Sequence, residues 1–282
     1  MTRRRRAARR TTVRREHIIK EVASALAPLP CVHAVWEAGA ASHGAVDEWS
    51  DVDICVDADD GTADRVFAAV ERAIRERFGI ALTYTMPFPP THDYSQRFYR
   101  LKGASRFALL DFAVFRHTAK DKFLNPVIHG EPVFLVTRGR PPRAAPWDSR
   151  AFAGAMRARL DRLRARREVF ACFVDKEVER GNWIEAMFNY QRITLDALLE
   201  VLGMLHRPQR YSFGVRYVHR ELPPAVVRRY ERLAFVRDGD DLRRKARSAD
   251  RWLVEAMAAV DFAKVDRSLR AAQRASKPGR KR

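Results

Sequence analysis

Two aspartates, Asp51 and Asp53, are separated by one residue and follow a glycine-containing loop that starts at Gly39. Apolar residues alternate with them through residues 52–56, a pattern typical of a half-buried strand. Successive strand side chains point to opposite faces, so both carboxylates are expected to project from the same edge of the sheet. Carboxylates held so close repel and raise each other's pKa, which a hard divalent cation between them relieves. The spacing therefore predicts metal-assisted phosphoryl transfer.

A third carboxylate, Asp111, lies in the apolar segment 108–115, which reads as a neighbouring strand. A buried carboxylate without a partner is costly, so Asp111 is expected to have a cation or a hydrogen-bond donor beside it. We predict that Asp51, Asp53 and Asp111 are catalytic residues that bind metal. The alternatives are that Asp51 and Asp53 are solvated residues at a strand start, and that Asp111 pairs with Arg100 or Arg106.

The loop before the acidic pair contains the candidate nucleotide-binding residues. Its glycines, Gly39 and Gly44, let backbone amides approach phosphate oxygens closely.

This stretch resembles the signature of the polymerase-β-type nucleotidyltransferase superfamily, and more closely that of the small bacterial antibiotic nucleotidyltransferases of the aminoglycoside and lincosamide type. That pattern is approximately Gly-Ser-x-Ala-Arg-Gly-x-Ala-Asp-Glu-Tyr-Ser-Asp-Ile-Asp. The positions in register here, with Trp49 at the aromatic position, are Gly39, Gly44, Asp47, Glu48, Ser50, Asp51 and Asp53.

The resemblance implies a transferase that uses Mg²⁺ or Mn²⁺ to move a nucleoside monophosphate, AMP from ATP, onto a hydroxyl of a small molecule such as an antibiotic. It also implies a helical second domain that contributes to the acceptor pocket. By the same resemblance, Gly39, Ala40, Ser42, His43 and Ser50 are the candidate nucleotide-binding residues. Two of these positions depart from the family in groups that bear on phosphate binding: Ala40 replaces the serine that contacts the triphosphate, and His43 replaces an arginine. Loss of one neutral hydrogen bond costs about 1 kcal/mol.

The elements expected around these residues alternate between helices and strands in the first half of the chain. Hydrophobic periodicity and turn residues predict helices over 16–27 and 62–78, strands over 31–36, 52–56, 80–86 and 132–136, and a hairpin of 98–102 with 107–115. The breaker-rich segment 138–146 is the expected linker.

Beyond the linker the pattern is helical throughout. Asp148 or Ser149 caps a long helix that ends near Arg180, Gly181-Asn182 interrupts it, and further helices are expected over 184–202, 223–236 and 240–275. We predict an α+β fold: a nucleotidyltransferase-like mixed sheet with flanking helices over 16–140, then an α-helical domain over 147–266.

The charge distribution places most of the excess positive charge outside the first domain. Of the formal net charge of +19, residues 1–16 and 267–282 contribute +7 each, whereas residues 17–140 sum to −2. We predict a disordered basic tail over 1–15, a basic tail over 267–282, and weak binding of polyanions by both. The charge leaves two alternatives open: the same chemistry on RNA or protein, and a catalytically silent nucleic-acid-binding module.

The composition excludes several classes of protein. With 46% hydrophobic residues in 282, the chain can bury a core, which excludes global disorder. No apolar run approaches the length needed to span a bilayer, and no apolar segment follows the arginine-rich start as in a secretory signal. Three widely spaced cysteines argue against a disulfide framework. A cytoplasmic protein is the expectation.

Overall fold

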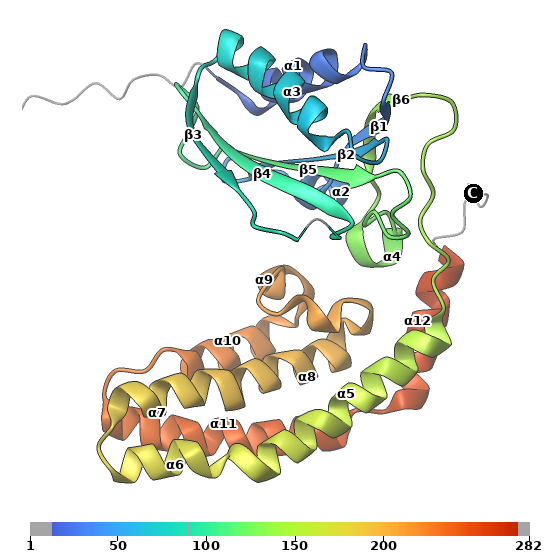
Figure 1. Cartoon of the computed structure of the whole chain (residues 1–282). Helices are drawn as coiled ribbons and strands as arrows, with labels where there is room; N and C mark the ends of the chain where they lie inside the picture. The colour runs from blue at the N-terminus through green and yellow to red at the C-terminus, as the bar shows by residue number, and fades with distance from the viewer. Residues whose placement is uncertain (1–12, 90, 276–282) are drawn as a thin grey trace, which may run out of the picture. The chain divides into compact units, whose positions relative to one another are not determined.

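The chain divides into two compact units, Met1–Trp147 and Asp148–Arg282. The computed structural model describes residues 13–89 and 91–275, drawn in colour in Figure 1. The first unit contains a mixed six-stranded sheet with flanking helices, and the second contains helices. The predicted α+β fold class is confirmed.

The sheet in the first unit has the spatial order β3-β4-β5-β2-β1-β6. β2 and β5 are parallel, and the other described pairings are antiparallel. The strands are β1 (Val32–Glu37), β2 (Val52–Ala58), β3 (Ile80–Thr85), β4 (Tyr94–Leu101), β5 (Leu109–Arg116) and β6 (Val133–Thr137). Two of the predicted catalytic aspartates, Asp53 and Asp111, lie in the parallel pair at the centre of the sheet. The third, Asp51, directly precedes β2.

Two helices, α1 (Arg15–Leu26) and α3 (Ala63–Arg77), cover one face of this sheet (Figure 1). Both are amphipathic, and their buried faces carry Ile18, Val22, Phe67 and Val70. The even-numbered residues of β2, from Val52 to Val56, point into the same core. Side chains alternate along a strand, so the odd-numbered residues of β2 point to the opposite face.

The opposite face carries a smaller apolar cluster. Trp36, Cys55, Phe115 and Leu124 are buried there. Asp53 lies on this face beside Cys55, because the two are separated by one residue of the same strand. Two short helices in the connections of this unit are α2 (Gly39–Ser42) and α4 (Pro126–His129).

The predicted elements of the first unit are found with small shifts at their ends. The hairpin of 98–102 with 107–115 corresponds to the antiparallel pair β4–β5, but β4 starts earlier, at Tyr94. The prediction of a disordered tail was wrong for residues 13–15. Val13 is buried and bridges to Ala104, and α1 starts at Arg15, because the tail's own apolar residue and first helical turn pack on the sheet. The rest of that tail, residues 1–12, lies outside the described residues.

The second unit starts at the predicted cap, since the Asp148 carboxylate accepts hydrogen bonds from the backbone N–H groups of Arg150 and Ala151. Its elements are α5 (Ser149–Phe170), α6 (Cys172–Glu179), α7 (Trp183–Asn189), a π-helical segment (Tyr190–Leu195), α8 (Asp196–His206), a 3-10 segment (Pro208–Phe213), α9 (Val218–Glu221), α10 (Pro224–Ala234), α11 (Gly239–Ala259) and α12 (Phe262–Ala275). None of the helices described in either unit has both the length and the apolar character needed to cross a membrane.

Two predicted helices of this unit are each split. The helix expected from Asp148 to Arg180 is interrupted at Ala171, whose dihedral angles remain helical, so α6 follows α5 after a single residue. The helix expected over 240–275 breaks at Val260, which is extended. Asp261 then accepts hydrogen bonds from two N–H groups of the first turn of α12, and this local cap ends one helix and starts the next. Residues 267–275 of the predicted basic tail belong to α12, and 276–282 lie outside the described residues.

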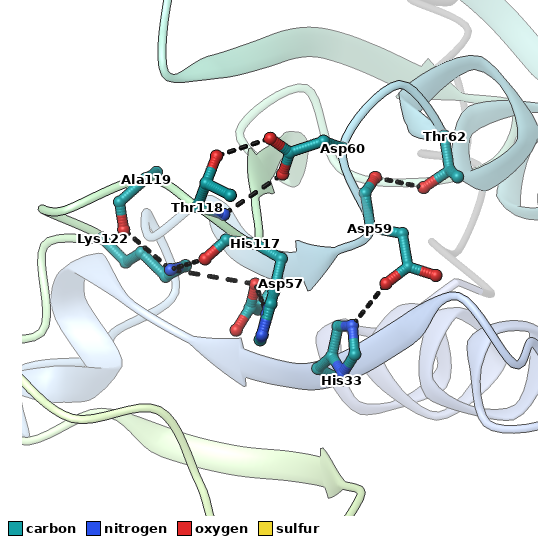
Figure 2. A network of polar contacts seen from close by, with 9 residues as sticks. All are labelled: His33, Asp57, Asp59, Asp60, Thr62, His117, Thr118, Ala119 and Lys122. Atoms are coloured by element: carbon teal, nitrogen blue, oxygen red, sulfur yellow. Dashed lines mark hydrogen bonds and ion pairs between the residues drawn. The ribbon is translucent and has the colours of Figure 1, made fainter.

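A polar network closes the end of β2 and β5 that lies farther from Asp51 and Asp53 (Figure 2). Asp57 is only 1% exposed, and its Oδ1 lies 3.1 Å from His117 Nδ1 and 3.9 Å from Lys122 Nζ. The ammonium group of Lys122 also donates to the carbonyl oxygens of His117 and Ala119. Burial raises the pKa of Asp57, and the charges of Lys122 and His117 oppose that rise. The network thus places an ammonium group and an imidazole beside a buried carboxyl group.

The imidazole of His117 stacks on that of His33 from β1, with ring centroids 3.9 Å apart. His33 Nε2 lies 2.7 Å from Asp59 Oδ1, and Asp60 accepts hydrogen bonds from the N–H and hydroxyl groups of Thr118. These contacts connect β1, the end of β2 and the segment after β5 to one another, as Figure 2 shows.

Replacing Lys122 with methionine is expected to lower the free energy of unfolding by about 3 kcal/mol, because Asp57 then loses the ammonium group that compensates its buried charge. Lys120→Met, at an exposed position of the same segment, is the control and should change stability by less than about 0.5 kcal/mol. Urea unfolding measures both. Equal effects of the two variants would contradict this role of Lys122.

Candidate functional site

Asp53 and Asp111 are register partners on the parallel strands β2 and β5. Neighbouring strands lie about 4.8 Å apart, and paired residues point to the same face, so the two carboxylates project side by side. Asp51 lies directly before β2, two residues from Asp53. The structure therefore brings the three predicted acidic residues to the amino-terminal end of the parallel pair.

Burial and neighbouring negative charge raise the pKa of Asp53 to about 7. The charges of Asp51 and Asp111 act in the same direction as burial, and the Arg15 guanidinium opposes them. Burial likewise raises the pKa of the Cys55 thiol, and the charges of Asp111 and Asp53 add to the rise. The negative charges of this part of the sheet thus disfavour ionisation of Asp53 and of Cys55.

Asp111 accepts a hydrogen bond from the side-chain amide of Gln96 on β4, with an Nε2–Oδ1 distance of 2.5 Å. Gln96 lies on the antiparallel neighbour of β5, within diagonal reach of Asp111. A donor or a cation beside Asp111 was expected from its apolar strand, but the sequence does not indicate that Gln96 is this donor. The amide orients the carboxylate without neutralising its charge.

Two charged residues of the site were missed from the sequence. Arg15, the first residue of α1, donates hydrogen bonds to the backbone carbonyl of Asp51 and to the carboxylate of Glu37. Glu37 is the last residue of β1, is 7% exposed and raises the pKa of Asp53 further. Glu37 could have been found as an acidic residue at the end of an apolar strand just before Gly39. Arg15 could not, because it is one of many arginines in a like-charged run.

Gly39 packs directly against the carboxylate of Asp53. Its φ is +56°, and a Cβ at this position would lie 1.8 Å from Asp53 Oδ2. The chain is anchored there by a hydrogen bond from the Ala38 N–H to the Asp53 carbonyl. A residue with a side chain therefore cannot occupy position 39 without displacing Asp53.

The other loop candidates follow Gly39 in order. Ala40 lies in α2 and presents no hydroxyl. The hydroxyl of Ser42 donates to the Glu37 carbonyl at 3.4 Å, and that of Ser50 donates to Asp47 Oδ1 at 2.8 Å. His43 follows α2 and packs against Gly130. A serine hydroxyl has one proton to donate, so Ser42 and Ser50 bind an anion only by exchanging these partners.

The acidic residues offer oxygen ligands of the kind that a divalent cation prefers. In the described part of the chain, no three His, Cys, Asp or Glu side chains are arranged as a ready metal site. Asp53 and Asp111 nevertheless supply two oxygen-donor carboxylates on adjacent strands. Mg²⁺ is usually bound through one or two carboxylates together with waters and substrate phosphates. The donor chemistry therefore fits Mg²⁺ bound together with a phosphate group.

Comparison with known proteins establishes no family for the chain. No protein-family model and no curated protein matches it. Among solved structures, it is similar to an aminoglycoside 6-adenyltransferase from Bacillus subtilis, with 11% sequence identity and a TM-score of 0.27 over 95% of this chain and 100% of that chain. A TM-score of this size establishes neither a shared fold nor a shared activity, so the site must be judged from its own residues.

Gly39→Ala is expected to lower the free energy of unfolding by about 2 kcal/mol more than Gly44→Ala does, because only the Cβ at position 39 collides with Asp53. Gly44 is the matched control, since its φ is +58° and a Cβ there would meet nothing within 4 Å. Both variants share the strain of positive φ, so the difference reports the contact. Urea unfolding measures it, and equal losses would contradict the close approach.

Stability should depend on pH through Asp53. Since its folded pKa lies above its ordinary value of 3.8, the folded protein binds more protons than the unfolded chain between about pH 4 and pH 7, and stability falls as the pH rises through that range. The full effect of such a shift is about 4 kcal/mol as an upper limit. Asp53→Asn removes this ionisation, so its stability should fall less between pH 5 and 8. Urea unfolding with a chelator present tests this, and parallel profiles would contradict it.

Proposed function

We propose that this protein is a metal-dependent nucleotidyltransferase that moves a nucleoside monophosphate, AMP from ATP, onto a hydroxyl of a small molecule. The observation that carries the proposal is the register pairing of Asp53 with Asp111 on parallel strands, with Asp51 two residues before Asp53. Carboxyl groups held this close raise one another's pKa, and a bound divalent cation relieves their repulsion. A metal–nucleotide complex is the ligand whose charge and oxygen chemistry match them.

In the proposed reaction, the acceptor oxygen attacks the α-phosphorus of the triphosphate. A new phosphorus–oxygen bond forms, the bond to the β-phosphate bridging oxygen breaks, pyrophosphate leaves, and the proton of the acceptor hydroxyl passes to water. Asp53 and Asp111, with Asp51, would hold Mg²⁺ or Mn²⁺. When bound, the cation would offset the charge that develops on the phosphate oxygens.

The chain's own residues position these acids. Gln96 orients Asp111, and Arg15 ties the backbone before Asp53 to Glu37. We assign the phosphate side of the site to Gly39, Ala40, Ser42, His43 and Ser50, because they form the connection between Glu37 and the acidic pair. Since Ala40 has no hydroxyl and the hydroxyls of Ser42 and Ser50 donate within the loop, backbone N–H groups and the cation must carry most of the phosphate binding.

Transfer should appear when the protein is incubated with ATP, MgCl₂ and a library of hydroxylated small molecules, as a product heavier by one nucleoside monophosphate in mass spectrometry. Asp53→Ala is expected to reduce the rate by at least about 100-fold, because it removes a carboxylate that acts on the transition-state charge. Glu48→Gln is the matched control, since it neutralises an exposed acid in the same loop and should leave the rate within about 2-fold.

The same assay separates the other acceptors. Radiolabelled ATP incubated with total RNA or with protein shows transfer to either class of macromolecule. No transfer to any acceptor, combined with salt-dependent binding of nucleic acid that survives Asp53→Ala, would replace the proposal with a catalytically silent binding module.

A further inference from the structure

The candidate site is flanked by an unusually exposed tryptophan. Trp49 is 58% exposed, although it belongs to the turn that leads into Asp51. Two residues separate their Cα atoms by at most about 7 Å. Trp49 therefore exposes a large apolar ring to water beside a site for a charged ligand. An apolar part of that ligand could bury the ring.

The turn holds the tryptophan in place. The backbone N–H of Trp49 donates to Asp47 Oδ1 at 3.0 Å, the N–H of Asp47 donates to the Ser50 hydroxyl at 2.9 Å, and the N–H of Ser50 donates to the Asp47 carbonyl at 3.2 Å. These contacts fix the backbone of residues 47–50. A fixed ring loses little freedom when it binds a ligand, which favours binding.

Phe107 fixes the ring itself from the neighbouring connection. Its ring meets that of Trp49 edge-on, with centroids 4.8 Å apart and an interplanar angle of 85°. The two residues lie at equivalent positions, each three residues before the register pair of Val52 with Leu110. The aromatic pair therefore lies at the same end of the parallel strands as the three acids.

The side chain of Arg106 adds a positive charge to this aromatic pair. The exposed guanidinium of Arg106 lies over the Phe107 ring, 4.6 Å from its centroid. An exposed aromatic ring beside an arginine is the combination that binds the base and the phosphates of nucleotides in many sites.

We infer that Trp49 is the platform on which the base of the nucleoside triphosphate stacks, with Phe107 supporting the ring and Arg106 supplying positive charge beside it. This inference rests on the proposed function, because the phosphates of the same nucleotide lie at Asp53 and Asp111. Stacking accepts any base, so the ligand class is a nucleoside triphosphate and not adenine alone. Trp49 is a binding residue and takes no part in proton or phosphoryl transfer.

The test compares ATP with inorganic tripolyphosphate, which lacks the base, by calorimetry of the full chain in MgCl₂. Trp49→Ala is expected to weaken ATP binding by about 10- to 100-fold and to leave tripolyphosphate binding within about 2-fold. Trp49→Phe keeps an aromatic face and should retain ATP binding within about 5-fold. The control is Tyr84→Ala, at a 56% exposed aromatic residue on edge strand β3, which should change neither affinity.

Unchanged ATP affinity in Trp49→Ala, or an equal loss for ATP and tripolyphosphate, overturns the inference, since the first shows no contact and the second shows a disturbed site. The proposed function fails separately. ATP binding that depends on Trp49 but leads to no transfer supports the platform and overturns the transferase. Transfer that requires Asp53, with an ATP KM that Trp49→Ala leaves unchanged, overturns the platform alone.

Discussion

The parallel pairing of β2 with β5 places Asp53 beside Asp111, and the surrounding structure accommodates that like-charge contact. Two carboxylates on adjacent strands of a buried sheet repel, and burial removes the water that would screen them. Asp53 responds with a pKa of about 7, so near neutral pH a bound cation can displace its proton into water. The pairing therefore keeps two carboxyl groups together at one end of the sheet, where a cation can bind them.

The neighbouring elements fit closely around this pair. Gly39 leaves room for the Asp53 carboxylate where no other residue could, and Gln96 binds Asp111 through a neutral amide. The nearby guanidinium of Arg15 is committed to the Glu37 carboxylate and the Asp51 carbonyl. Four carboxyl groups, those of Glu37, Asp51, Asp53 and Asp111, thus lie close enough to influence one another at the candidate site.

The opposite end of the same strands shows the contrast. Asp57 is more deeply buried than Asp53, yet Lys122 and His117 lie against its carboxylate. A buried carboxylate beside a cation acts as a structural contact, whereas carboxylates that raise one another's pKa are typical of functional sites. One pair of strands thus carries a structural charge at one end and the candidate chemical site at the other.

Local sequence patterns were sufficient for the elements and for part of the site. Alternation and helical periodicity depend only on neighbouring residues, so β2, β5, α1 and α3 could be predicted, and Asp51, Asp53 and Asp111 stood out against their apolar strands. The breaks at Ala171 and Val260 were missed because the apolar periodicity continues across them.

Only the tertiary structure shows the roles of Arg15, Glu37, Gln96 and Lys122. These roles depend on contacts between residues far apart in the chain, and a single sequence does not show which of its distant residues come into contact. The register of β2 against β5 also could not be predicted from local patterns, because the packing of the whole sheet determines which strands pair. That register places Asp53 beside Asp111 and Trp49 beside Phe107.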